Sequence, residues 1–131
     1  MSGWIGVDLD GTLAYYDGWS TIDTIGEPIL PMVDKVKKLL AEGIEVKIFT
    51  ARVCMHNQID ISTSQTINAI SPIKEWCKKH IGQELEVTNI KDFSMIELWD
   101  DRCKQVIFNK GLYIEEYLNV VQKQENTKKT N

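Results

Sequence analysis

Residues 4–13 read Trp4-Ile5-Gly6-Val7-Asp8-Leu9-Asp10-Gly11-Thr12-Leu13, an apolar run followed by two aspartates that flank a leucine. The first four of these residues form a short apolar run that is followed by turn-forming residues. This pattern predicts a buried strand ending near Asp8. Asp8 and Asp10 are therefore expected at the carboxyl end of the first strand.

A helix and a second strand are expected next. Pro31 can occupy a first helical turn, and apolar residues then recur at helical spacing until Gly43. Residues 44–48 alternate between apolar and charged, which predicts a strand that ends at Thr50. Because a strand-helix-strand unit normally forms a parallel, right-handed crossover, Thr50 should reach the same sheet edge as Asp8.

The remaining chain continues the alternation of helices and strands. The polar stretch 53–71 has no clear helix boundary and fits either a loop or a broken helix. Beyond it the predicted elements are a helix over 71–82, strands over 85–87, 96–99 and 106–108, and a helix over 114–121. We expect the polar tail 122–131 to fray. The predicted fold is a single α/β domain over residues 1–121. It is a three-layer, Rossmann-like arrangement with a mainly parallel sheet, helices on both faces and no separate cap domain.

Composition narrows the possible partners. The chain has 131 residues, 43% hydrophobic and 26% charged, with a formal net charge of −4. A length of this size suits one domain, and the acidic balance gives no reason to expect a nucleic-acid backbone or an anionic membrane. No leader sequence or long apolar run is visible, so we expect no membrane insertion. The three cysteines are widely separated, which favours free thiols and a cytoplasmic location.

Four carboxylates are expected at one edge of the sheet. Asp100 and Asp101 follow the predicted strand 96–99, as Asp8 and Asp10 follow the first strand. Ligands of open parallel α/β sheets bind at the carboxyl ends of the strands. Like charges a few ångströms apart repel by about 1 to 4 kcal/mol per pair at effective dielectrics of 80 to 20. A hard divalent cation with oxygen ligands would neutralise them, and Mg²⁺ is the expected ion.

These segments resemble the motifs of the haloacid-dehalogenase-like (HAD) hydrolase superfamily. Its first motif, an apolar strand followed by Asp-x-Asp-Gly-Thr-Leu, is matched without a difference by residues 4–13. Its second motif, an apolar strand ending in Thr or Ser, resembles residues 47–50, and its fourth resembles residues 96–101. The third motif is a single lysine, for which Lys91 is preferred and Lys74 is the alternative. The resemblance spans most of the chain and implies a small, capless member of the superfamily.

The resemblance implies a role for each motif residue. Asp8 would form an aspartyl-phosphate intermediate, and Asp10 would act as general acid and then as general base. Thr50 and Lys91 would complete the catalytic set by contacting the phosphoryl group. Further phosphate contacts are implied for Leu9, Gly11, Thr12, Ala51 and Arg52. The implied Mg²⁺ ligands are Asp8, the backbone carbonyl of Asp10, Asp100 and Asp101, with Asp100 preferred over Asp101 for the direct bond.

Each of these residues also has a plainer interpretation. The acidic pairs could be solvated turns, Thr50 could cap a helix, and Lys91 and Arg52 could be surface charges. Tyr15, Tyr16 and Trp19 could form a flap over a substrate or pack on the domain's own core. The agreement of several motifs in order favours the functional interpretation.

The predicted function is Mg²⁺-dependent hydrolysis of a phosphomonoester. A small phosphorylated substrate is expected. The segment 14–27 has room only for a short flap rather than a cap domain, so a wide opening could also admit a nucleotide or the phosphorylated end of a macromolecule. A phosphotransferase or a nucleic-acid end phosphatase could use the same residues, although the acidic balance disfavours the second. A non-catalytic phosphate-binding protein or a signalling receiver domain is a further alternative. The order of the motifs argues against a receiver, because here Asp-x-Asp comes first. The sequence does not predict the physiological substrate or the oligomeric state.

Overall fold

The computed structural model describes residues 3–18 and 21–130, which fall into two compact units. The first unit is Met1–Asp101 and the second is Arg102–Asn131. All of the strands lie in the first unit, together with the candidate site, so the two units are treated separately below.

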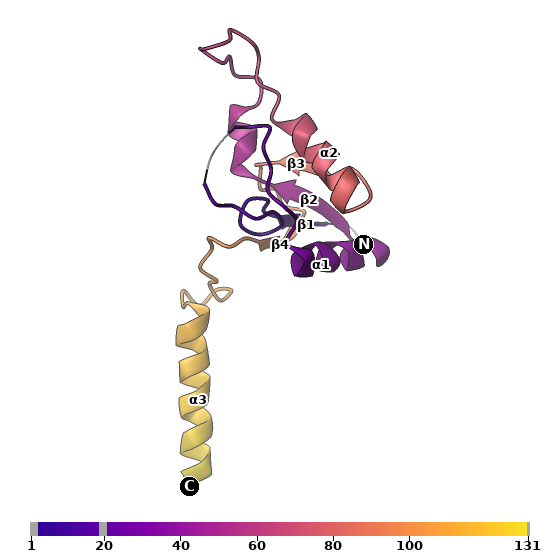
Figure 1. The fold of residues 1–131 in the computed structure, drawn as a ribbon. Helices are drawn as coiled ribbons and strands as arrows, with labels where there is room; N and C mark the ends of the chain where they lie inside the picture. The colour runs from indigo at the N-terminus through magenta and orange to yellow at the C-terminus, as the bar shows by residue number, and fades with distance from the viewer. Residues whose placement is uncertain (1–2, 19–20, 131) are drawn as a thin grey trace. The chain divides into compact units, whose positions relative to one another are not determined.

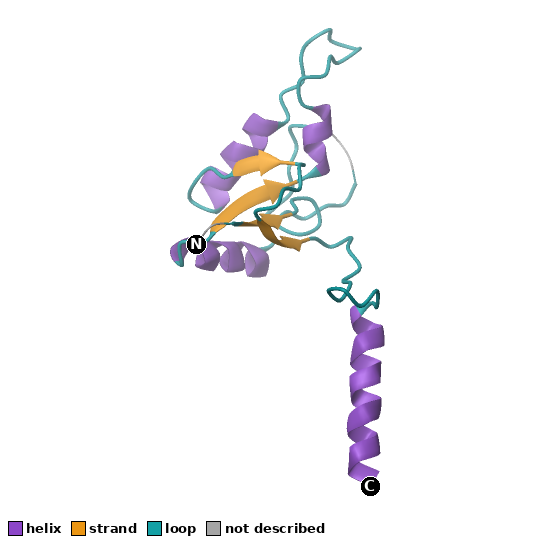
Figure 2. Cartoon of the chain, turned by 180° about the vertical axis from the view of Figure 1, so that it is seen from behind, coloured by secondary structure: helices purple, strands orange, loops and turns teal. Residues whose placement is uncertain are grey.

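The first unit contains a four-stranded parallel sheet in the order β3-β2-β1-β4 (Figure 1). Its strands are β1 (Trp4–Val7), β2 (Glu45–Phe49), β3 (Glu86–Thr88) and β4 (Met95–Trp99). Figure 2 shows the same strands from behind, with the loops that continue from them. With its helices, this arrangement confirms the predicted α/β, Rossmann-like fold, and the described residues form no separate cap domain.

The position of β1 explains the apolar run that opens the chain. The strand pairs with β2 on one side and with β4 on the other, and all four of its residues are buried. A strand enclosed in this way has no solvated face, so its sequence reads as continuously apolar rather than alternating. The predicted first strand is confirmed, and it ends directly before Asp8.

Two helices cover the core of the first unit. Helix α1 (Leu30–Ala41) has Pro31 in its first turn, and helix α2 (Ile70–His80) has Pro72 in its first turn. Gly43 follows α1 with a φ of 80°, a left-handed conformation that ends the helix at low cost. The fully buried side chains that these elements share include Val7, Val33, Val36, Ile48 and Ile73.

The polar stretch 53–71, in which the sequence shows no clear helix boundary, contains the end of a short helix and a loop. The 3₁₀ helix η1 (Ala51–Met55) begins directly after Thr50. The chain then forms a loop closed by an isolated bridge between Ile59 and Thr66 before α2 begins. Thus η1 is connected directly to the carboxyl end of β2, where the site lies.

The second unit differs from the sequence prediction in two respects. The strand predicted over 106–108 is wrong, because Val106 forms only an isolated antiparallel bridge with Tyr113. Asn109 and Gly111 adopt positive φ and turn the chain back at once, so the apolar triplet pairs with no strand. The helix predicted over 114–121 is longer in the structure, because α3 (Ile114–Thr130) continues into the polar tail, whose fraying stays a prediction. Gln, Lys and Glu are strong helix formers, which favours this extension.

None of the helices in the described residues combines the length and the apolar character needed to cross a bilayer.

Candidate functional site

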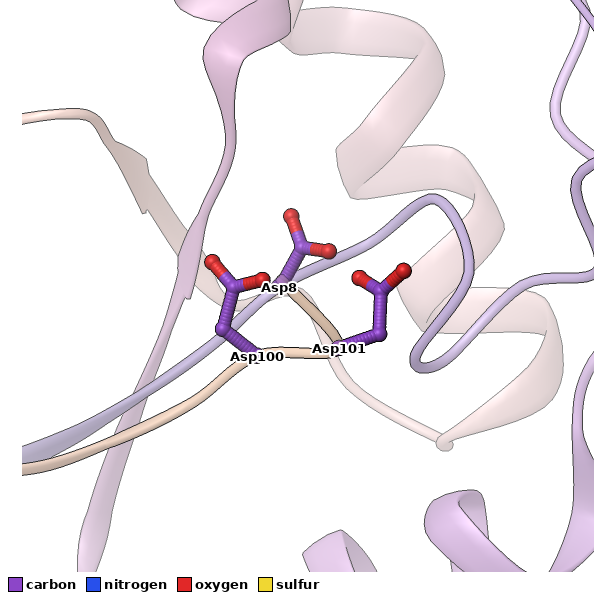
Figure 3. Close-up of side chains that lie close together, drawn as sticks. All are labelled: Asp8, Asp100 and Asp101. Carbon is purple, nitrogen blue, oxygen red and sulfur yellow. The ribbon is translucent and has the colours of Figure 1, made fainter. Parts of the chain in front are cut away.

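Three aspartates from two neighbouring strands converge at one sheet edge (Figure 3). Asp8 follows β1, whereas Asp100 and Asp101 follow β4, and these strands are paired in parallel with Val7 opposite Trp99. The backbone N–H of Asp8 donates to the carbonyl of Trp99 at 2.9 Å. One carboxylate oxygen of each aspartate lies within 4.8 Å of the other two. We call these three residues the acidic trio.

The loop after β1 fixes two members of the acidic trio. The buried Thr12 hydroxyl lies 3.3 Å from Oδ2 of Asp8 and 3.2 Å from Oδ1 of Asp101, and it accepts from the backbone N–H of Asp101 at 3.2 Å. Gly11 has a φ of 87°, and a Cβ built on it would lie 2.8 Å from Oδ2 of Asp101. Glycine is therefore required here both by the backbone conformation and by the approach of a carboxylate.

Burial, together with the neighbouring carboxyl groups, raises the pKa of Asp8 from its usual 3.8 to about 7. Desolvation by burial is the largest cause, followed by a side-chain hydrogen bond with Asp101 and by the negative charges of Asp100 and Asp101. The hydrogen bond from Thr12 acts in the opposite direction. Asp8 thus keeps its proton to a higher pH than an ordinary carboxyl does, chiefly because burial disfavours its charged form.

Asp10 lies in different surroundings, although only Leu9 separates it from Asp8. Its carboxylate is bound by the guanidinium of Arg52, with Nε to Oδ2 at 2.7 Å and Nη2 to Oδ1 at 2.8 Å. The carboxylate of Asp10 is not part of the acidic trio. Asp10 and Arg52 are 42 residues apart in the sequence, and no sequence pattern pointed to their pairing.

The predicted phosphate-contacting residues lie close to the trio and to this ion pair. Thr50 is buried and caps η1, with its side chain accepting from the backbone N–H of Arg52 at 3.2 Å. Ala51 is exposed at the start of η1, and the side chain of Leu9 is fully buried. The backbone N–H groups of Gly11 and Thr12 donate within the loop, to Ala14 and Leu9.

The two candidate lysines lie on different elements. Lys91 is exposed in the connection between β3 and β4, and Lys74 is half-buried on α2. Among the described residues, no hydrogen bond or ion pair links either lysine to the acidic trio. The choice between them remains a prediction.

A small open pocket of about 60 Å³ adjoins the ion pair. Its lining includes Asp10, Arg52, Tyr15, Tyr16, Thr24 and Gly26. Tyr15 and Tyr16 thus lie where a flap was expected, whereas Trp19, the third candidate, lies outside the described residues. Glycine is required at position 26 of this lining, because a Cβ there would overlap the carbonyl oxygen of Tyr15.

Comparison with known proteins supports the fold. No protein-family model matches the chain, and no curated protein matches its sequence. A solved structure, that of a conserved protein coded by a locus of Bacteroides thetaiotaomicron, is similar with a TM-score of 0.54 and 18% sequence identity. The match covers 95% of this chain and 93% of that chain. At this identity the likeness concerns the fold alone.

Proposed function

We propose that this chain is a Mg²⁺-dependent phosphomonoester hydrolase of the HAD-like type, which acts through an aspartyl-phosphate intermediate on Asp8. The observation that carries the proposal is the acidic trio at the carboxyl end of a parallel sheet, with the pKa of Asp8 raised to about 7. Such crowding costs stability unless a cation offsets it, and perturbed carboxyls at a sheet edge are typical of functional sites.

The donor set of the trio suits Mg²⁺. All of its ligands are carboxylate oxygens within 4.8 Å of one another, and hard cations prefer oxygen ligands. Asp8 and Asp100 would hold the ion directly together with the backbone carbonyl of Asp10, and Asp101 would act directly or through water. Bound there, the ion would supply the positive charge that lets three carboxylates and a phosphate occupy one site.

Asp8 and Asp10, in the loop after β1, would have different roles in the reaction: Asp8 as nucleophile and Asp10 as general acid and base. A carboxylate oxygen of Asp8 would attack phosphorus, forming a new O–P bond while the bond to the leaving-group oxygen breaks. The Asp10 carboxylate, bound on both oxygens by Arg52, would take up a proton from solvent as the substrate binds and give it to that oxygen. It would then take a proton from the water that attacks the phosphoryl group. This second attack releases inorganic phosphate and restores Asp8.

Two further groups would stabilise the phosphoryl oxygens. Thr50 lies at the carboxyl end of β2 and could donate its hydroxyl hydrogen, since its oxygen already accepts from Arg52. One lysine, Lys91 or Lys74, would balance the charge between the nucleophile and the phosphate. Comparing Lys91→Met with Lys74→Met tests this choice, because the active-site lysine should account for most of the lost turnover.

The expected substrate is a small phosphorylated molecule in the cytoplasm. The pocket beside Asp10 has a volume of only about 60 Å³, which suits a small leaving group. The three cysteines are widely separated in the sequence, a pattern that favours reduced thiols and hence a reducing compartment.

Phosphate release from an aryl phosphate, with and without Mg²⁺, tests the proposal. Turnover should require the metal and fall by roughly 10³-fold or more in Asp8→Asn, because the nucleophile is lost. Lys47→Met, which removes a cation that pairs with Glu86 on the sheet, is a control that should retain activity. Folded, Mg²⁺-supplied wild-type protein that is inert across phosphorylated metabolites and 3′- or 5′-phosphorylated oligonucleotides would contradict the proposal.

A further inference from the structure

The guanidinium of Arg52 joins two separate parts of the site. Beyond its two hydrogen bonds to Asp10, its Nη1 donates to the carbonyl of Ile22 at 2.8 Å and its Nη2 donates to the carbonyl of Thr24 at 2.9 Å. The residue is buried, and its side chain is only 6% exposed. One side chain thus links the loop after β1 to the segment that precedes α1.

This segment is otherwise held mainly at its base. The backbone N–H of Tyr15 donates to the carbonyl of Glu27 at 2.8 Å, and the indole N–H of Trp76 donates to the carbonyl of Gly26 at 3.0 Å. The hydrogen bonds from Arg52 reach further along the segment, at residues 22 and 24. The pocket beside Asp10 is lined by residues of this same segment. Loss of the guanidinium would therefore release both the carboxylate and the pocket wall.

The chemistry of the pair favours a positioning role. A planar guanidinium binds a carboxylate through two parallel hydrogen bonds, which fixes orientation as well as charge. A buried ion pair is a poor source of net stability, because desolvation offsets most of the attraction. Lysine would keep the charge at this position but could not form the same fork.

We propose, on the basis of the proposed function, that Arg52 is a positioning residue that holds Asp10 and the pocket wall at residues 22–24 as one unit. The leaving group of the substrate enters the pocket, and Arg52 holds the Asp10 carboxyl toward it. Arg52 acts through Asp10 and forms no bond to the reacting atoms.

Leaving-group dependence distinguishes this role from a merely structural one. A nitrophenolate departs without a proton, whereas an alkoxide such as that of glycerol phosphate needs a general acid. Arg52→Lys should therefore lower kcat/KM for the alkyl phosphate at least about 10-fold more than for the aryl phosphate. Lys47→Arg, which likewise exchanges one cation for another in an ion pair, should leave the ratio between the two substrates unchanged.

A double-mutant cycle tests whether Arg52 acts through Asp10. In the Asp10→Asn background, Arg52→Lys should lower activity on the alkyl phosphate by less than about 3-fold, because the group it positions is already absent. Independent losses that multiply, or equal losses on both substrates in the single variant, would overturn the proposal.

Hydrogen exchange supplies a readout that does not need activity. Amides of residues 21–27 should exchange faster in Arg52→Lys and in Asp10→Asn than in wild type, while amides of α1 and β2 keep their rates. Unchanged exchange rates in both variants would overturn the proposal that Arg52 holds this segment. An inert wild-type protein would count against the proposed function, and the exchange result would still decide whether Arg52 holds this segment.

Discussion

Asp8 and Asp10 lie two residues apart in one loop, yet their electrostatic surroundings are opposite. Asp8 faces two further carboxylates, and its pKa is raised to about 7. Asp10 faces a buried guanidinium that binds both of its oxygens. The first arrangement brings three carboxylates together, whereas the second pairs one carboxylate with a cation. The contrast shows that two carboxylates of one short loop can have opposite electrostatic surroundings.

The largest expected effect is a loss of Mg²⁺ affinity when single aspartates of the acidic trio are replaced. Asp100→Asn should weaken Mg²⁺ binding by about 10-fold or more, since a charged ligand is lost. Asp101→Asn should cost less, because Asp101 is also held by Thr12 and serves partly to orient the site. Titration calorimetry with Mg²⁺ alone measures both affinities. Equal, unmeasurably small effects of the two changes would show that the trio does not bind the ion.

Neutralising Asp8 and Asp10 separately should change stability in opposite directions. Without metal, Asp8→Asn relieves repulsion and should raise the free energy of unfolding above that of wild type. Asp10→Asn leaves the buried Arg52 without its charged partner and should lower it by about 1 to 3 kcal/mol. Urea denaturation of both variants measures the difference. Two changes of the same sign would break the contrast between these carboxylates.

Gly11 lies against Asp101, so replacing it tests whether the position of that carboxylate matters for Mg²⁺ binding. Gly11→Ala and Gly43→Ala both place a Cβ on a residue with positive φ, so each should cost about 1 to 2 kcal/mol of stability. Only at Gly11 would the new Cβ meet Asp101, because nothing lies within 4 Å of the corresponding position at Gly43. Mg²⁺ affinity should therefore fall in Gly11→Ala and stay unchanged in Gly43→Ala.

Changing pH should change the free energy of unfolding of the metal-free protein through Asp8. Because the folded-state pKa of Asp8 is raised from 3.8 to about 7, the native state retains a proton that the unfolded chain has lost. Stability should therefore fall as pH rises from about 4 to about 7 and then level off, as far as this group determines it. Asp8→Asn should flatten that slope, and Mg²⁺ affinity of wild type should rise over the same interval. Thermal unfolding at several pH values without metal, compared between the two proteins, checks the sign.

The sequence predicted which strand ends meet at one edge of the sheet. It did not predict the side-chain contacts that form there. The apolar run before Asp8 and the alternation before Thr50 each indicate a strand, and parallel pairing then brings the strand ends together. The bond between Arg52 and Asp10 depends on how η1 turns away from β2, which no local periodicity encodes. The failed strand at 106–108 has a related cause, since an apolar run forms a strand only where a neighbouring backbone can pair with it.

The roles proposed for the two aspartates are tested most directly by trapping the phosphoryl group. Asp10→Asn, supplied with Mg²⁺ and an aryl phosphate whose leaving group needs no proton, should form the acyl phosphate quickly and hydrolyse it slowly. Acid quenching followed by borohydride reduction converts an aspartyl phosphate to homoserine, which peptide mass mapping locates. The account predicts homoserine at position 8 in this variant. Phosphate release with Asp8 unmodified at every quench time would contradict it.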